Sequence, residues 1–190
     1  MARITPLTGR RAPLVLRLLN RGIRRRFGQE MAPLAIMAYN PRFILAYLGT
    51  GQFVLGRTRL DTQLRTLAMQ LVAATNGCAW CIDFGQSVAE REGILPRKMA
   101  EIMTYADNAL FSPAERFALE YAEAMTRLES DISDDLFARL RQHFDEREIV
   151  ELTAAIATEN MYNRFNKALG VESQGFCAVP SLHPLTRRAA

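Results

Sequence analysis

The chain has 190 residues, of which 49% are hydrophobic and 23% charged, as in an ordinary globular domain and unlike a disordered or fibrous protein. The net charge of +4 hides an uneven distribution, because residues 1–30 carry eight arginines against a single acid, Glu30. Three cysteines are too few for a secreted disulfide scaffold, and arginines interrupt the apolar run that a signal peptide requires. We therefore expect a cytoplasmic protein of one domain.

The arginine-rich N-terminal segment has two interpretations. Its charge could attract nucleic acid or an anionic membrane surface. Alternatively, a helix opened by Pro13 docks on the body of the protein through Leu14, Leu18 and Leu19 and leaves its arginines in solvent. We favour the docked helix and expect neither nucleic-acid binding nor membrane binding.

Helix signals continue along the chain, whereas the alternation typical of strands is hard to find. The most apolar region, residues 31–56, is broken by prolines and glycines and does not predict a membrane-spanning helix. Within it, Asn40-Pro41 is typical of an N-cap followed by the first helical residue. The central helix is expected to begin with a capping box at Thr58-x-x-Asp61, after which leucines recur at helical spacing.

The end of this central helix is marked by Asn76-Gly77, a C-terminal stop signal. Cys78 is therefore expected to begin the next helix, which should end near Gly93. Pro96 then predicts the start of a further helix.

The second half of the chain carries stronger helix-start signals. The motif "SPAE" places Ser112 at an N-cap with a proline and a glutamate at the first and third helical positions. Ser133 is expected to cap a short helix, and Asp145-x-x-Glu148 to open a long one that runs to Gly170. These signals predict an all-α fold.

The predicted organisation is a single helical domain with two flanking segments. We expect a basic helical extension over residues 1–30, the domain itself over residues 31–177, and an irregular tail over residues 178–190.

The stretch "NGCAWCIDFGQ" contains Cys78 and Cys81 in a C-x-x-C arrangement with three interpretations. A zinc site would need two further ligands, and the sequence offers only Cys177, His143 and His183, so we expect no metal. Two buried core thiols are a second interpretation. We favour a redox pair, because the first turn of a new helix directs N–H groups at the sulfurs and lowers thiol pKa values.

The segment "LRTLAMQLVAATNGCAWCIDFG", residues 64–85, resembles the signature of the carboxymuconolactone decarboxylase family, in its C-x-x-C-bearing alkylhydroperoxidase D-like branch. The segments "FSPAERFALEYAEAMT", "HFDEREIVELTAAIATEN" and "NRFNKALGV" are similar to the downstream helices of that family. The resemblance implies an all-α bundle and assembly into a trimer or hexamer. It also implies a thiol oxidoreductase without a cofactor, acting on a hydroperoxide or a partner disulfide and recycled by an unknown thiol reductant.

Peroxidases of this branch support their thiols with a proton relay of one glutamate and two histidines. The corresponding positions in this sequence are Thr66, Trp80 and Gly85, none of which exchanges a proton near neutral pH. Only Cys78 and Cys81 match, so we expect weak peroxidase activity at most. The alternative is a non-catalytic helical oligomer that keeps the fold.

Four residues near the cysteines are candidates for a supporting role. Asp83 is either a helper of the thiols or a first-turn acid that faces solvent. Trp80 is either a packing anchor or a surface on which substrate stacks. Glu159 and Asn160 lie on the long C-terminal helix, which packs near the C-x-x-C helices in the family.

Overall fold

The computed structural model describes residues 2–128 and 131–177, and the described residues form helices joined by short loops, without a strand. The predicted irregular tail at residues 178–190, which includes His183, lies outside the described residues. The α-helices are α1 (Leu14–Phe27), α2 (Ala32–Met37), α3 (Pro41–Leu55), α4 (Thr62–Asn76), α5 (Ala79–Arg91), α6 (Pro96–Ala100), α7 (Pro113–Thr126), α8 (Asp134–Arg141) and α9 (Glu146–Ala168), with 3₁₀ helices η1 (Gly9–Arg11) and η2 (Ile102–Asp107).

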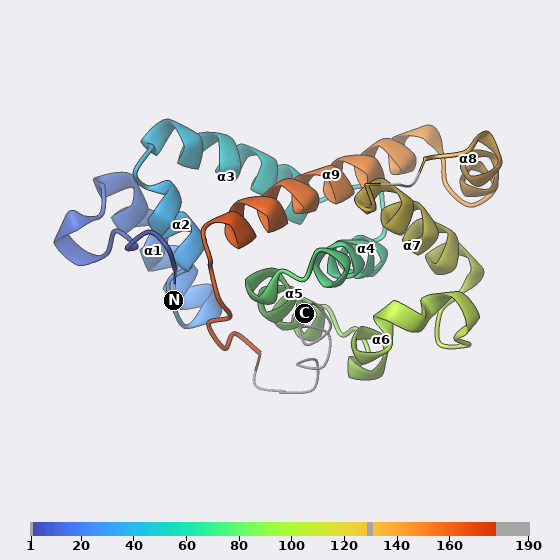
Figure 1. Cartoon of the computed structure of the whole chain (residues 1–190), viewed down its shortest axis with the longest axis horizontal. Coiled ribbons are helices and arrows are strands. Elements are labelled where there is room, and N and C mark those ends of the chain that lie inside the picture. Colours follow the sequence, from blue (N-terminus) through green and yellow to red (C-terminus); the bar gives the residue numbers. More distant parts are fainter. Residues whose placement is uncertain (1, 129–130, 178–190) are drawn as a thin grey trace.

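Helix α4 lies at the centre of the fold. Its main neighbours are α9, α7 and α5, and Figure 1 shows α9 crossing the molecule beside it, with α1 and α2 at one end and α8 at the other. Helix α4 is buried over most of its length, including the polar Arg65, Thr66 and Gln70. The all-α prediction is confirmed.

Most predicted helix starts are confirmed because their signals are local. Asn40 caps α3, with Pro41 as its first residue. Ser112 and Asp145 form complete capping boxes with Glu115 and Glu148, at the starts of α7 and α9. In contrast, the single helix predicted after Pro96 is two short elements, α6 and η2.

The start of α4 differs from the predicted capping box at Thr58. The N-cap is Asp61, whose carboxylate accepts a hydrogen bond from the Leu64 N–H at 2.8 Å. The Thr58 hydroxyl instead accepts a hydrogen bond from the Arg65 guanidinium at 3.1 Å. The helix therefore begins three residues later than predicted, and Asp61 is its N-cap rather than its third residue.

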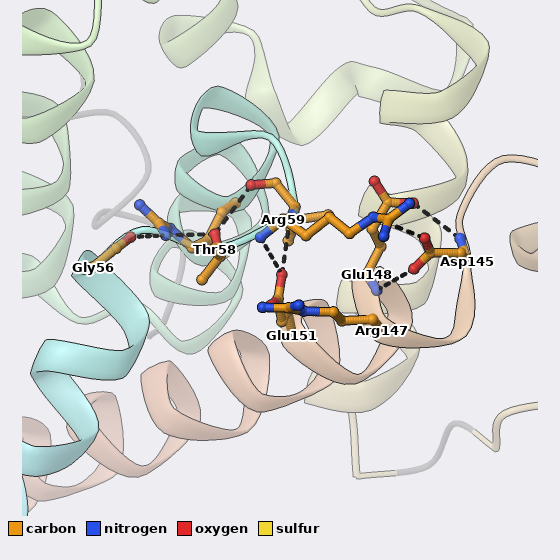
Figure 2. A network of polar contacts seen from close by, with 9 residues as sticks. Gly56, Thr58, Arg59, Asp145, Arg147, Glu148 and Glu151 are labelled. Atoms are coloured by element: carbon orange, nitrogen blue, oxygen red, sulfur yellow. Dashed lines mark hydrogen bonds and ion pairs between the residues drawn. The ribbon is translucent and has the colours of Figure 1, made fainter.

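The loop before α4 is held by Glu151, one turn into α9 (Figure 2). One carboxylate oxygen accepts hydrogen bonds from the N–H groups of Arg59 and Leu60, both at 2.8 Å, and the other pairs with Arg147 at 3.0 Å. Burial alone would raise the pKa of Glu151, but its hydrogen bonds outweigh the effect of burial, so the pKa is lowered. Arg59 also pairs with Asp145 at 3.0 Å. This network fixes the start of α4 against the start of α9.

The N-terminal helix α1 is present, and of the three leucines predicted to dock, Leu19 packs against the core while the other two do not. Leu14 and Leu18 are 68% and 54% exposed, whereas Leu16 is fully buried. Ile23 and Phe27 complete the inward side, further along the helix. The prediction was wrong for Leu14 and Leu18 because apolar residues occur on both sides of α1, so spacing alone did not identify the side that packs.

The segment before α1 lies against the body of the protein. The N–H of Arg3 donates to the carbonyl of Leu169 at 2.8 Å, and the N–H of Leu7 donates to the carbonyl of Ala35 at 3.0 Å. No helix in the described part of the chain is long and apolar enough to cross a membrane.

Candidate functional site

The two cysteines of the C-x-x-C motif lie at the tight junction between α4 and α5. Gly77 ends α4 with a left-handed backbone (φ +63°), as the stop signal predicts. Cys78 is the N-cap of α5, and its sulfur accepts a hydrogen bond from the N–H of Cys81 at 3.4 Å. The two cysteines are joined by a disulfide, with their Cα atoms 5.3 Å apart. The geometry therefore brings both sulfurs to a helix N-terminus, where a thiolate is stabilised.

The second sulfur has a donor from another helix. Asn166 on α9 directs its amide nitrogen at the sulfur of Cys81, 3.4 Å away, and is almost completely buried. Its amide oxygen has no hydrogen-bond partner among the described residues. Sequence reasoning did not single out Asn166. The available signal was a run of polar residues at spacings of three and four on α9, a helix that otherwise packs in the core.

The other polar residues on this side of α9 form a buried network. Asn160 accepts a hydrogen bond from Asn76 at 2.9 Å and donates to the hydroxyl of Thr126 at 3.1 Å. Asn163 accepts from Asn76 at 3.2 Å and donates to the carboxyl of Glu159 at 2.5 Å. Asn160 thus ties α9 to α4 and α7, and it has no described hydrogen bond to either sulfur.

Glu159 is the titratable group of this network. Burial raises the pKa of its carboxyl to about 7, although the hydrogen bond from Asn163 acts in the opposite direction. Glu159 is two helical turns before Asn166, roughly 10 Å along the helix axis. It therefore lies away from the sulfurs while lining the same cavity as Cys81.

A cavity of about 370 Å³ opens beside Cys81. Its wall is mainly apolar and is built by residues from α1 to α5 and α9. Among the residues that line it are Phe27, Met31, Leu48, Met69, Trp80, Cys81, Phe84, Val88, Glu159 and Tyr162. The volume falls at the lower end of the range for small-molecule sites.

The three positions that correspond to the relay of the peroxidases, Thr66, Trp80 and Gly85, all line this cavity. A side chain at Gly85 would require Gln70 to move, because an added Cβ would lie 2.3 Å from the amide oxygen of Gln70. The place of the second relay histidine of the peroxidases is therefore occupied by the side-chain amide of Gln70, from α4.

Trp80 packs in an aromatic cluster at one wall of the cavity. Its ring stacks on Phe84 with centroids 5.0 Å apart and meets Phe176 edge-on at 5.8 Å. Its indole N–H donates to the side-chain oxygen of Gln174 at 2.7 Å. Trp80 is buried and fully partnered, which supports the packing interpretation.

Asp83 is buried, at 7% exposure, so the interpretation as a solvent-facing acid was wrong. One oxygen accepts hydrogen bonds from the Ser173 hydroxyl and from the N–H groups of Gln174 and Gly175 at 2.7 to 2.8 Å. The other accepts from the N–H of Cys177 at 3.0 Å. Burial alone would raise the pKa of Asp83, but these hydrogen bonds, led by that of Cys177, lower it. All its described partners belong to the segment after α9.

In residues 2–128 and 131–177, no three His, Cys, Asp or Glu side chains are grouped so that they could hold a metal ion. The chemical groups gathered at the cavity include one sulfur of the disulfide, a buried carboxyl and aromatic rings.

Comparison with known proteins identifies the family. The model of the carboxymuconolactone decarboxylase family matches residues 41–124. YnjA of Escherichia coli (strain K12), an uncharacterized protein, is 35% identical over 170 residues, which are 88% of this chain and 93% of YnjA. The chain belongs to the carboxymuconolactone decarboxylase family.

Solved structures with the same fold include a debrominase variant and a peroxidase-related protein. A variant of the debrominase Bmp8 in complex with 2,3,4-tribromopyrrole is 20% identical, with a TM-score of 0.82 over 93% of this chain and 95% of that one. An uncharacterized peroxidase-related protein from Ralstonia eutropha JMP134, described as an alkylhydroperoxidase AhpD core, is 18% identical, with a TM-score of 0.80 over 92% and 94%. This member of the family therefore has the alkylhydroperoxidase D-like fold.

Proposed function

We propose that this protein is a thiol–disulfide oxidoreductase that cycles Cys78 and Cys81 between dithiol and disulfide. The observation that carries the proposal is that the two sulfurs are bonded to each other and that Cys81 forms part of the wall of a small-molecule cavity. Each sulfur also has a hydrogen-bond donor, the Cys81 N–H for one and Asn166 for the other. Such donors favour the thiolate, which is the reactive form.

The two cysteines have different roles in this proposal. Cys81 lines the cavity, so it is the thiol that meets the substrate. Cys78 is almost completely buried at the N-cap, where its thiolate is stabilised, and it attacks the modified Cys81 to close the disulfide. In the return step an external thiol attacks Cys81, and Cys78 leaves as the better-stabilised thiolate.

The reaction balances with either of two oxidants. With a hydroperoxide, the dithiol is oxidised to the disulfide while the O–O bond breaks to give an alcohol and water. With a partner disulfide, the pair is oxidised and the partner is released as two thiols. Because Thr66, Trp80 and Gly85 replace the relay residues, we expect the hydroperoxide reaction to be slow, by about 10²–10⁴-fold relative to a relay-assisted one.

A redox titration with alkylation trapping and mass spectrometry tests the proposal. In a dithiothreitol buffer series, the pair should show one defined midpoint potential. Cys78→Ser and Cys81→Ser should each abolish it, and the matched control Cys177→Ser should keep it, because Cys177 is a free thiol outside the pair. A pair that stays reduced under mild oxidant would leave the non-catalytic oligomer as the better description.

Reductive debromination is a second candidate, favoured by the structural similarity to Bmp8 and by the apolar wall of the cavity. In this reaction a carbon–bromine bond would be replaced by a carbon–hydrogen bond, bromide would leave, and the dithiol would become the disulfide. Bromide release from 2,3,4-tribromopyrrole, dependent on Cys81 and on a thiol reductant, distinguishes it from the first candidate.

A further inference from the structure

The cavity beside Cys81 has an apolar interior and a cationic opening. Arg26 on α1 lines the cavity and is also exposed to solvent, so it lies where the cavity opens. Its guanidinium lies 5.4 Å from the ring centroid of Phe27, which also lines the cavity. A second guanidinium, that of Arg91, lies over the same ring at 4.6 Å and donates to the carbonyl of Arg26.

The charge at this opening is not neutralised by a direct ion pair. Within the described residues, the nearby acid Glu30 pairs with Arg24, at 2.5 Å, and no carboxylate pairs with Arg26. Glu92 interacts with Arg26 only at longer range and is shared with Arg65. Inside the cavity, the carboxyl of Glu159 has its pKa raised to about 7 by burial, so below that pH it adds little negative charge.

An apolar chamber with a positively charged opening suits one kind of ligand. We propose that this cavity binds medium-chain amphipathic carboxylates, with the hydrocarbon chain inside and the carboxylate at Arg26. The volume of about 370 Å³ gives room for roughly a dozen water-sized groups. A ten-carbon acid has about that number of non-hydrogen atoms. The proposal rests on the proposed function for one point: the group that reacts with Cys81 is carried on the chain of this acid.

Trp80 provides a direct readout of binding. It is the single tryptophan of the chain and it lines the cavity, so its fluorescence reports on a ligand at this site. We suggest titrating the oxidised protein at pH 6.5 with decanoate, 1-decanol and decyltrimethylammonium, below their micelle-forming concentrations, with calorimetry as a second measurement. These probes share a chain length and differ in the charge of the head.

Decanoate should bind most tightly, and its affinity should fall as salt is added. Arg26→Gln should weaken decanoate binding by about three- to tenfold and leave 1-decanol unchanged, because the exposed ion pair contributes modestly. Arg25→Gln is the matched control: it removes the same charge from the neighbouring exposed position, which does not line the cavity, and should have no effect.

The proposal is overturned if 1-decanol or the cation binds as tightly as decanoate, or if Arg25→Gln and Arg26→Gln weaken decanoate equally. It also fails if no probe changes the Trp80 fluorescence or releases heat. The comparison of the three probes on the unmodified protein decides the matter even if a variant does not fold. Binding is measured without turnover, so a failure here leaves the redox titration of Cys78 and Cys81 as an independent test of the proposed function.

Discussion

The amide oxygen of Gln70 occupies the place where a side chain at Gly85 would begin. Gln70 is 1% exposed, and an added Cβ on Gly85 would lie 2.3 Å from that oxygen. The oxygen has no hydrogen-bond partner among the described residues, while the amide nitrogen of Gln70 donates to the carbonyl of Ile82 at 3.5 Å. A histidine at position 85, as in the peroxidases, would therefore require Gln70 to move.

Replacing Gly85 by alanine should reveal this coupling. Gly85→Ala is expected to destabilise the protein by about 1–2 kcal/mol, because the buried amide of Gln70 must be displaced. In a Gln70→Ala background the same replacement should stabilise it by about 0.5–1 kcal/mol, because alanine favours a helix interior over glycine. Urea unfolding of the four proteins of a double-mutant cycle measures both values. Additive effects would contradict the contact.

Asn166 should control the acidity of the nearby thiol. Asn166→Leu removes the donor to the Cys81 sulfur, so the thiol pKa should rise by roughly one unit. At a pH above that pKa, the midpoint potential should become more negative by about 30 mV, since the reduced form loses stabilisation. Thiol titration and the redox buffer series measure these shifts. Asn160→Ala, which removes no donor to sulfur, should change stability without changing the thiol pKa.

Asp83 should hold the segment after α9 in place. Asp83→Asn is expected to cost about 2–3 kcal/mol, because an amide cannot accept hydrogen bonds on both sides from the donors that now surround the carboxylate. Hydrogen exchange at Gln174, Gly175 and Cys177 should accelerate most. The exposed Asp107→Asn is the control and should change neither quantity.

The same carboxylate makes an acid-side prediction. The pKa of Asp83 is lowered in the folded protein, so its contribution is present at neutral pH and is lost as the pH falls below the unfolded value of 3.8. If hydrogen exchange in residues 173–177 is insensitive to Asp83→Asn, this segment is held by contacts other than those with Asp83.

Glu159 should make stability depend on pH in the opposite direction. Its pKa is 4.5 in the unfolded chain and about 7 in the folded protein, so the folded state retains a proton that the unfolded state has lost. Stability should therefore fall as the pH rises from 4.5 to 7, by on the order of 3 kcal/mol. Glu159→Gln should remove this fall, and urea unfolding at pH 5 and pH 8 measures it.

Glu151→Gln is the control for this experiment, because the pKa of Glu151 is lowered rather than raised. Its effect should be a loss of stability that is larger at pH 8 than at acid pH. A pH dependence that is the same in the wild type and in Glu159→Gln would contradict a neutral buried carboxyl.

Assembly is predicted from exposed apolar residues near the N-terminal end of the fold. Leu18 and Leu45 are 54% and 61% exposed, and such residues are common at subunit contacts. Light scattering should show a trimer or hexamer, and Leu45→Glu should yield smaller species. Leu95→Glu, at a residue 58% exposed elsewhere, should leave the assembly intact. A monomer of 21 kDa in the wild type would exclude this prediction.

The parts of this fold that could be predicted from sequence depend on local chemistry. The stop at Gly77, the cap at Ser112 and the box opened by Asp145 each involve a few neighbouring residues. The position of Cys78 at the mouth of a helix followed from the first of these signals. This placed the C-x-x-C pair without knowledge of any long-range contact.

The remaining features depend on partners far along the chain. Leu16 is buried and Leu14 is exposed because of where α1 packs, and no local signal distinguishes them. Asp83 is buried because residues 173–177 fold over it, and Asn166 contacts a sulfur 85 positions earlier. Asp83 and Asn166 are polar residues whose contacts form only when distant parts of the chain come together.

The attachment of residues 173–177 to α5 has a consequence for biosynthesis. A ribosome makes the chain from its N-terminus, so the cysteines emerge long before the segment that binds Asp83 and Trp80. Until that segment arrives, Asp83 and Trp80 lack these hydrogen bonds and the aromatic cluster lacks Phe176. The contacts that hold Trp80 and Phe84 in the cavity wall therefore form only after residues 173–177 have been translated, and a message cut short before codon 173 would encode the cysteine pair without them.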